Sequence, residues 1–270
     1  MCRFNHLTKD QNYSLLMKIG DKDSLVDRTW SSNTLGFSEI YFQFWIKLNE
    51  YRHVVFPLSD EAFLEQGFLL TFDKDWRLTS KPISKMPNRL MRPTAVVVNK
   101  TWSGDCDIFM IGGDESRCSL KYDTKLDEWT WLPKLPPGCP ISCNVCVNYL
   151  GRAIFTFTVD GKLNIKAAVM YLKNVQSERK KEDVIQEMEW CFERKQEDHK
   201  IDRFHIKCAE VMNDGSIAVV ARGRTPGMKM QVSCIVLRFD VVYGQNGKIT
   251  LTMRKDIQLM FPTIFCRQLD

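Results

Sequence analysis

The feature that most constrains this chain is a series of short, strand-sized apolar runs between residues 107 and 150. Asp107–Gly113 reads DIFMIGG, Cys118–Asp123 reads CSLKYD, and Glu128–Leu135 reads EWTWLPKL. A fourth run follows a turn within Pro136–Leu150, PPGCPISCNVCVNYL. Gly, Pro and Asp residues separate the runs, as they separate the strands of all-β proteins. The segment therefore predicts a repeat of four strands.

Three positions give this segment a family likeness. Gly112-Gly113 ends the first run, Tyr122-Asp123 ends the second, and Trp129 lies in the third. The segment resembles a kelch repeat, in which a strand ends in a Gly-Gly pair and an aromatic-Asp turn precedes a Trp. The resemblance implies an all-β fold, a kelch-type β-propeller, with loop surfaces that meet other proteins.

Degenerate copies of the same four runs occur along the rest of the chain. Innermost strands are expected at Tyr41–Leu48, Thr94–Asn99, Asn144–Leu150, Lys207–Met212 and Thr263–Leu269. Second strands are expected at His53–Leu58, Asp107–Gly113, Arg152–Phe157 and Ser216–Ala221. Third strands are expected at Tyr13–Gly20, Gly67–Asp73, Cys118–Asp123, Ala167–Leu172 and Ser233–Asp240. Outer strands are expected to hold Trp30, Trp76, Trp129, Trp190 and the run Ile249–Arg254.

The tryptophans of the outer strands set the length of the repeat. The first four are separated by 46, 53 and 61 residues, and a kelch unit is about 50 residues long. The widest gap contains a charged insertion at residues 176–188 (QSERKKEDVIQEM), which is expected to form a loop or one short helix. Residues 1–270 are then expected to form a single propeller domain.

The strand count predicts five blades. The chain begins with the last two strands of one blade, passes through four complete blades, and ends with one innermost strand, Thr263–Leu269. Pairing of that strand with the N-terminal strands would close the ring and remove exposed sheet edges. Kelch propellers more often have six blades, so a divergent or truncated six-bladed protein stays open as the alternative.

Composition and charge narrow the classes of partner. The chain has 38 basic and 33 acidic residues, a net charge of +5, which is too mild to predict nucleic-acid binding. Residues 1–10 contain no apolar signal-peptide region, and no run approaches the roughly 18 apolar residues of a membrane span. We therefore expect a cytoplasmic protein without a membrane partner, whose ten cysteines are free thiols.

Two groups of residues have the spacing of metal ligands. Cys139, Cys143 and Cys146 form a C-x3-C-x2-C pattern, the thiolate spacing of some iron–sulfur sites. The pattern spans a Pro-rich turn and the start of a strand, where alternate side chains point to opposite faces, so a structural role is favoured. His199 and His205 lie in the charged segment EDHKIDRFH, which is expected to be a solvated loop. Neither group predicts a metal or cofactor.

No catalytic signature is found in the sequence. A nucleophile elbow, a P-loop and a dinucleotide-binding fingerprint are all absent. Trp129 and Trp131 alternate with Thr130, as residues of a half-buried strand do, and are expected to pack between blades rather than to stack on a ligand.

Basic residues gather in two segments that are expected to connect strands. The segments are Lys81–Arg92 (KPISKMPNRLMR) and Arg222–Lys229 (RGRTPGMK). Loops of propellers commonly carry binding residues, so these segments predict contacts with an acidic protein partner. The candidate partner-binding residues are Lys81, Lys85, Arg89, Arg92, Arg222, Arg224 and Lys229.

The function that follows from the kelch resemblance is an analogy. It implies a non-enzymatic protein–protein interaction module, a scaffold or adaptor that recognises substrates within a larger assembly. A structural subunit of a large complex is a second hypothesis. A metal-dependent propeller enzyme is a third, disfavoured because the expected inner strands carry few His, Tyr or carboxylate side chains.

Overall fold

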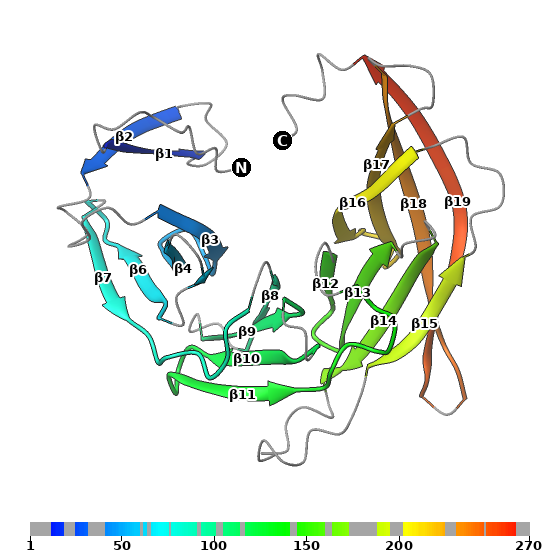
Figure 1. Cartoon of the computed structure of the whole chain (residues 1–270), viewed down its shortest axis with the longest axis horizontal. Coiled ribbons are helices and arrows are strands. Elements are labelled where there is room, and N and C mark those ends of the chain that lie inside the picture. Colours follow the sequence, from blue (N-terminus) through cyan, green and yellow to red (C-terminus); the bar gives the residue numbers. More distant parts are fainter. Residues whose placement is uncertain are drawn as a thin grey trace. The chain divides into compact units, whose positions relative to one another are not determined.

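The chain folds into antiparallel β-sheets that belong to two compact units (Figure 1). Unit 1 is Met1–Arg89 and unit 2 is Leu90–Asp270; each is described by itself. The computed structural model describes residues 12–18, 25–31, 41–59, 62–63, 66–75, 77–90, 93–100, 105–113, 117–140, 145–159, 164–172, 188–194, 202–224, 231–245 and 247–262. Within these ranges, no helix has the length and apolar character that crossing a membrane requires.

Unit 1 contains two sheets. Strands β1 (Asn12–Lys18) and β2 (Leu25–Ser31) form an antiparallel pair. The other sheet of unit 1 has the order β3-β4-β6-β7, with a short β5 paired to β4. Its strands are β3 (Tyr41–Lys47), β4 (Arg52–Ser59), β5 (Ala62–Phe63), β6 (Phe68–Phe72) and β7 (Leu78–Pro82).

Unit 2 contains three four-stranded sheets that follow one another along the chain. We number the sheets of the repeat along the chain, so that the β3-β4-β6-β7 sheet of unit 1 is the first and those of unit 2 are the second, third and fourth. The second sheet comprises β8 (Thr94–Asn99), β9 (Cys106–Ile111), β10 (Ser119–Asp123) and β11 (Glu128–Leu132). The third comprises β12 (Val145–Tyr149), β13 (Ala153–Val159), β14 (Ile165–Tyr171) and β15 (Glu189–Arg194). The fourth comprises β16 (Asp202–Val211), β17 (Ile217–Arg224), β18 (Gln231–Tyr243) and β19 (Ile249–Pro262).

The predicted all-β class is confirmed, and so is the predicted strand order along β3-β4-β6-β7 of unit 1 and in the three four-stranded sheets of unit 2. The sheet of unit 1 has a fifth strand, β5, which was not predicted. In each sheet the predicted strands lie side by side in chain order, from the expected innermost strand to the expected outer strand. Strand β8 has the predicted bounds, Thr94–Asn99. The expected closing strand Thr263–Leu269 and most of the insertion at 176–188 lie outside the described residues. Ring closure, the number of blades and the single-domain organisation stay predictions.

The third sheet is covered on both faces by its neighbours in unit 2. Six of the seven residues of β13 are buried, and successive side chains belong to two different cores. Phe155 and Phe157 pack in the core shared with the fourth sheet, whereas Ile154 packs in the core shared with the second. Because side chains alternate across a strand, an unbroken apolar strand indicates burial on both faces. Face-to-face packing therefore joins the three sheets into one unit.

The innermost strands of unit 2 contact one another in sequence, β8 with β12 and β12 with β16. The side chain of Asn148 donates from Nδ2 to the carbonyl oxygen of Val97 at 3.4 Å, which links β12 to β8. Three aromatic rings link the third and fourth sheets: Phe157 lies 6.5 Å from Phe155 and 5.4 Å from Phe239 between ring centroids. This packing of consecutive sheets is the kind that adjoining propeller blades show.

The segment that resembles a kelch repeat forms the second sheet. Tyr122 and Trp129 are cross-strand partners with ring centroids 5.0 Å apart. Gly112 and Gly113, after β9, have φ values of 74° and 86°, which only glycine adopts readily. Asp123 accepts hydrogen bonds from the backbone N–H groups of Lys125 and Leu126 and so closes the turn into β11. Trp129 thus contacts its own sheet.

A buried histidine lies in unit 1. His53 in β4 is 3% exposed, pairs in register with Lys47, and meets the ring of Phe72 edge-on at 5.8 Å. Burial, together with the nearby Lys47 charge, lowers the pKa of His53 to about 4. The imidazole is therefore neutral in the folded protein at physiological pH.

Truncation of the aromatic core of unit 2 should be strongly destabilising. Phe157 is fully buried between two other aromatic rings, so Phe157→Ala is expected to cost about 3–5 kcal/mol of unfolding free energy. The matched control Leu126→Ala removes an exposed side chain and should change stability by less than about 0.5 kcal/mol. Urea unfolding followed by circular dichroism measures both, and equal effects would contradict this account of the core.

Acid should destabilise unit 1 through His53. The unfolded chain takes up its proton near pH 6.5 and the folded chain only near pH 4, so stability is complete above pH 6.5 and falls below it. Between pH 7.5 and pH 5.0 the loss is expected to be about 2 kcal/mol. Urea unfolding of the wild type and His53→Gln at both pH values should show a smaller pH dependence in the variant.

Candidate functional site

Three of the predicted binding residues form a basic strip on unit 1. The basic strip consists of Lys81 in β7 and of Lys85 and Arg89 in the segment that follows it, and all three are exposed. Ile83 and Met86, which lie between them in the sequence, are 5% and 3% exposed. Buried apolar residues thus anchor the segment while the basic side chains remain at the surface.

Three contacts fix the backbone of the strip. The N–H of Ile83 donates to the carbonyl oxygen of Gly67 at 3.0 Å. Gln66 donates from Nε2 to the carbonyl oxygens of Ile83 and Gly67 at 2.5 and 3.0 Å. A Cβ on Gly67 would lie 2.7 Å from Cε1 of Phe56 and 2.9 Å from Cδ1 of Ile83. Only glycine allows this approach without displacement, so the strip is held in a defined position.

The sequence around the strip is rich in basic residues and lacks acidic ones. Between Arg77 and Gly104 the sequence has six basic residues and no acidic residue. Lys81 forms no ion pair with any residue that the structure describes. The strip is therefore a positively charged surface.

The remaining predicted binding residues have other positions or lie outside the described residues. Lys81 belongs to β7, and Arg222 and Arg224 belong to β17, so the expectation that these three lie in connections between strands is wrong. The pairing of β17 with β16 extends as far as Asp202 and Arg224, which lengthens both strands beyond the predicted bounds. Arg92 and Lys229 lie outside the described residues. The assignment of these residues to partner binding stays a prediction.

A second surface, which sequence reasoning missed, is formed by hairpin turns of unit 2. We call it the turn face: the turns that join the first strand to the second, or the third to the fourth, in its sheets. Five large apolar side chains lie in these turns or at the strand ends beside them. Among the described residues of unit 2 they are the most exposed of their kind, with exposed fractions of 39% to 63%. They are Leu126, Leu150, Met212, Val242 and Tyr243. A leucine at a tight turn, as at Leu150-Gly151, was the available sequence signal.

Tyr149 connects the turns of the third and fourth sheets. Burial, together with the nearby side chain of Tyr243, raises the pKa of Tyr149. A Cβ on Gly215, in the turn between β16 and β17, would lie 3.7 Å from the hydroxyl of Tyr149. The N–H of Ile249 also donates to the hydroxyl of Tyr171 at 2.9 Å. These turns therefore lie together at one end of the two sheets.

A charged network lies on the fourth sheet beside these turns. Arg254 donates from Nε to both carboxylate oxygens of Asp240 at 2.7 Å and from Nη1 to Asp214 at 2.9 Å. Arg238 and Ser216 also donate to Asp214, at 3.0 and 2.6 Å. The Ser216 and Arg254 donors hold the pKa of Asp214 well below its usual range.

The pKa of Asp240 is likewise lowered, chiefly by its hydrogen bonds from Arg254. Asp214 and Asp240 therefore both remain ionised at neutral pH. A glycosidase pair needs one carboxyl group that keeps its proton, and this pair contains none. The network ties the strands together and offers no acid catalyst.

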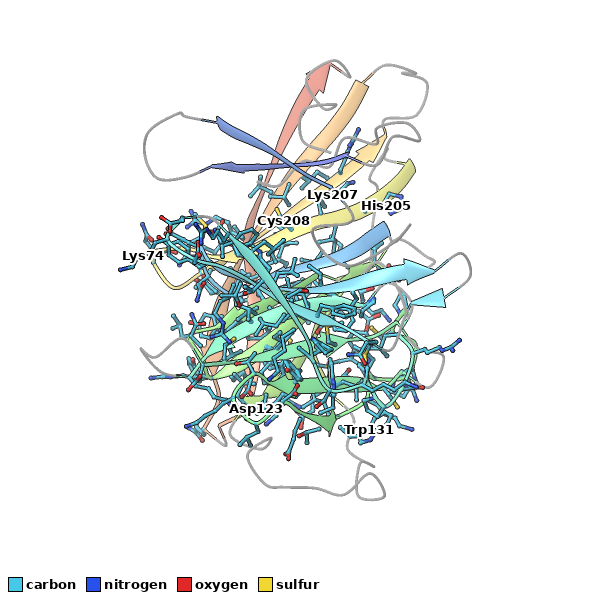
Figure 2. All side chains as sticks on the ribbon, turned by 90° about the vertical axis from the view of Figure 1, so that its left-hand side faces the viewer. Lys74, Asp123, Trp131, His205, Lys207 and Cys208 are labelled. Atoms are coloured by element: carbon cyan, nitrogen blue, oxygen red, sulfur yellow. The ribbon has the colours of Figure 1, made fainter. Side chains whose placement is uncertain are left out.

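Strand β16 places several reactive side chain types on an innermost strand. His205, Lys207 and Cys208 follow one another along it and are exposed (Figure 2). The pairing with β17 shifts register between Ile206 and Cys208, as a β-bulge does. The expectation of a solvated loop up to His205 is thus wrong, because β16 begins at Asp202. No group of three His, Cys, Asp or Glu residues that could hold a metal occurs among the described residues.

The described cysteines of the C-x3-C-x2-C pattern lie in the apolar core. Cys139 and Cys146 both pack in the core between the second and third sheets, and Cys143 lies outside the described residues. Burial raises the pKa of each of these two thiols to about 12. Both therefore remain protonated at neutral pH, as buried structural cysteines do.

Alkylation should separate the buried thiols from the exposed one. Cys208 is exposed, whereas Cys139, Cys146 and Cys191 are buried with pKa values raised to about 12. With iodoacetamide under native conditions, Cys208 should react at least about tenfold faster than the other three, because the thiolate is the reactive form. Peptide mass spectrometry over time measures the rates. Equally fast labelling of Cys146 would contradict the described core.

Comparisons with known proteins give no family. No protein-family model and no curated protein matches the sequence. One similar solved structure is an exo-1,5-alpha-L-arabinanase from a bovine ruminal metagenomic library, 12% identical over 93% of this chain and 95% of that chain, with a TM-score of 0.40. Another is a fungal alcohol oxidase of the AA5 family in complex with copper, 18% identical over 75% of this chain and 51% of that chain, with a TM-score of 0.34. Likeness at this level assigns no activity or substrate.

These comparisons overturn the prediction of a non-enzymatic protein–protein interaction module. Both solved structures are enzymes, and an arrangement of sheets by itself never excludes catalysis. The predicted scaffold or adaptor role was derived from the fold alone, so it is withdrawn together with the prediction of a non-enzymatic module. A function has to be argued from the surfaces of this chain.

Proposed function

We propose that this chain binds an acidic polypeptide segment through the basic strip of unit 1. The proposal rests on one observation: the basic side chains of the strip are exposed while its backbone is held in place. Lys81, Lys85 and Arg89 are exposed on a segment that buried Ile83 and Met86 anchor. A surface that is already ordered loses little conformational entropy on binding. The proposal concerns the ligand and does not class the chain as a non-enzyme.

The spacing of the strip favours a peptide over nucleic acid. Successive basic residues are four positions apart, and an extended chain spans at most about 3.3–3.6 Å per residue, so neighbouring charges can be separated by more than 10 Å. Duplex DNA has one charge per about 1.7 Å of axis, a much denser array of charges. Three widely spaced cations suit separate carboxylates on a polypeptide better.

We also propose that the chain is a kelch-type propeller. The contact between Tyr122 and Trp129 and the positive φ values of Gly112 and Gly113 support this, because they place the three quoted features of the repeat in one sheet. The confirmed strand order in four consecutive sheets gives further support. Five blades, closed by the C-terminal strand, and a cytoplasmic location remain part of the proposal.

Removal of the strip should weaken binding to an acidic peptide. The triple variant Lys81→Ala/Lys85→Ala/Arg89→Ala is expected to lose about tenfold in affinity, since each exposed ion pair contributes about 0.2–1 kcal/mol. The probe is a fluorescein-labelled peptide rich in Glu and Asp, measured by anisotropy at low and at physiological salt. Binding by the wild type should fall as salt rises, because salt screens exposed charges.

A matched variant separates position from net charge. Lys47→Ala/Lys74→Ala/Lys125→Ala also removes three exposed lysine charges and should keep nearly full affinity. Equal losses in the two variants would mean that only net charge matters and would sink the proposal. Tighter binding of a DNA or RNA oligonucleotide than of the peptide at physiological salt would also overturn it.

A further inference from the structure

The turn face of unit 2 supports an inference that is independent of the basic strip. Exposed large apolar side chains are normally scattered singly over a surface. Here Leu150, Met212 and Tyr243 occupy turns that meet around the hydroxyl of Tyr149. The apolar side chains therefore gather at one end of the third and fourth sheets. Contiguous apolar groups on a water-exposed surface mark a site that another molecule covers.

Leu150 is unfavourable at its position in two ways. It is 63% exposed, and its φ of 52° lies in the left-handed region. Gly151 follows with a φ of 65°, and the N–H of Arg152 closes the turn onto the carbonyl oxygen of Tyr149 at 2.9 Å. A two-residue turn with positive φ at both central positions strongly prefers Asn-Gly or Asp-Gly. A leucine that is costly in both solvation and backbone conformation points to a contact that needs its side chain.

The charges near this site balance one another. The charged network on the fourth sheet is paired internally: Arg238 and Arg254 donate to Asp214, and Arg254 also donates to Asp240. Arg152, in the turn after β12, and Glu210, near the end of β16, are exposed and form no ion pair with any residue that the structure describes. Arg152 and Glu210 thus place one charge of each sign beside the apolar group of the third and fourth sheets.

We propose that the turn face of unit 2 binds the same face of a second copy of this chain. In a two-fold contact each surface meets itself, so residue i faces residue j and residue j faces residue i. Arg152 of each copy then faces Glu210 of the other, and the apolar group around Leu150 and Tyr243 is buried between them. The same face of a second copy carries one charge of each sign, so it can pair with both groups at once.

Balanced charge argues against an anionic membrane as the occupant. Attraction to anionic lipid supplies about 1 kcal/mol for each basic residue near the surface, and stable attachment requires two membrane signals. One free arginine beside one free glutamate gives almost no net attraction. The tips of tight hairpin turns also offer single side chains rather than an amphipathic helix.

Sedimentation velocity of the full chain across the micromolar range tests the proposal. The wild type should be a dimer that dissociates on dilution. Leu150→Asn should raise the dimer dissociation constant at least about tenfold, as expected for a residue central to an interface. Asn is favoured at positive φ, so circular dichroism melting should show an unchanged or more stable fold. The matched control Tyr51→Ser removes an exposed aromatic side chain of unit 1 and should leave the dimer intact.

A charge exchange identifies the second copy as the occupant. Arg152→Glu and Glu210→Arg should each weaken the dimer, and the double variant should restore it to within about threefold of the wild type, because the pairs are re-formed with reversed sign. A monomer at all concentrations, a dimer that Leu150→Asn leaves unchanged, or a double variant that does not recover would each overturn the proposal. Capture of the monomer on phosphatidylserine vesicles would overturn it in favour of a membrane surface.

Discussion

Face-to-face packing of consecutive four-stranded sheets is the constraint on which the structure of unit 2 depends. The third sheet is buried on both sides, and the two faces of β13 and β14 enter separate cores. Phe157, between Phe155 and Phe239, makes the aromatic part of one of these contacts. Burial of apolar area at this scale is the dominant favourable term in folding. No sheet of the unit could retain this core alone.

The same packing decides where surfaces for binding arise. Because each sheet is an antiparallel series with its strands in chain order, the turns between first and second strands and between third and fourth strands share one end of the sheet. Packing of the third sheet on the fourth then brings Tyr149 and Tyr243 into contact. The turn face is therefore a consequence of sheet packing, whereas the basic strip depends on local anchors, Ile83 and Met86.

The functional conclusions rest on surfaces and on the charge states of individual groups. Both carboxylates of the Asp214–Arg254–Asp240 network remain ionised, and the buried thiols of Cys139 and Cys146 remain protonated. The first group therefore lacks an acid catalyst, and the second consists of inert, buried thiols.

Sequence alone determined the strand inventory and its order, because each strand is a short apolar run and the turn residues between runs are local signals. The bounds of β8 and the positions of Tyr122 and Trp129 followed directly. Tertiary structure decided what depends on neighbours: the extension of β16 to Asp202 through pairing with β17, and the meeting of Leu150, Met212 and Tyr243 around Tyr149. Those residues are far apart in the chain, so no local pattern could bring them together.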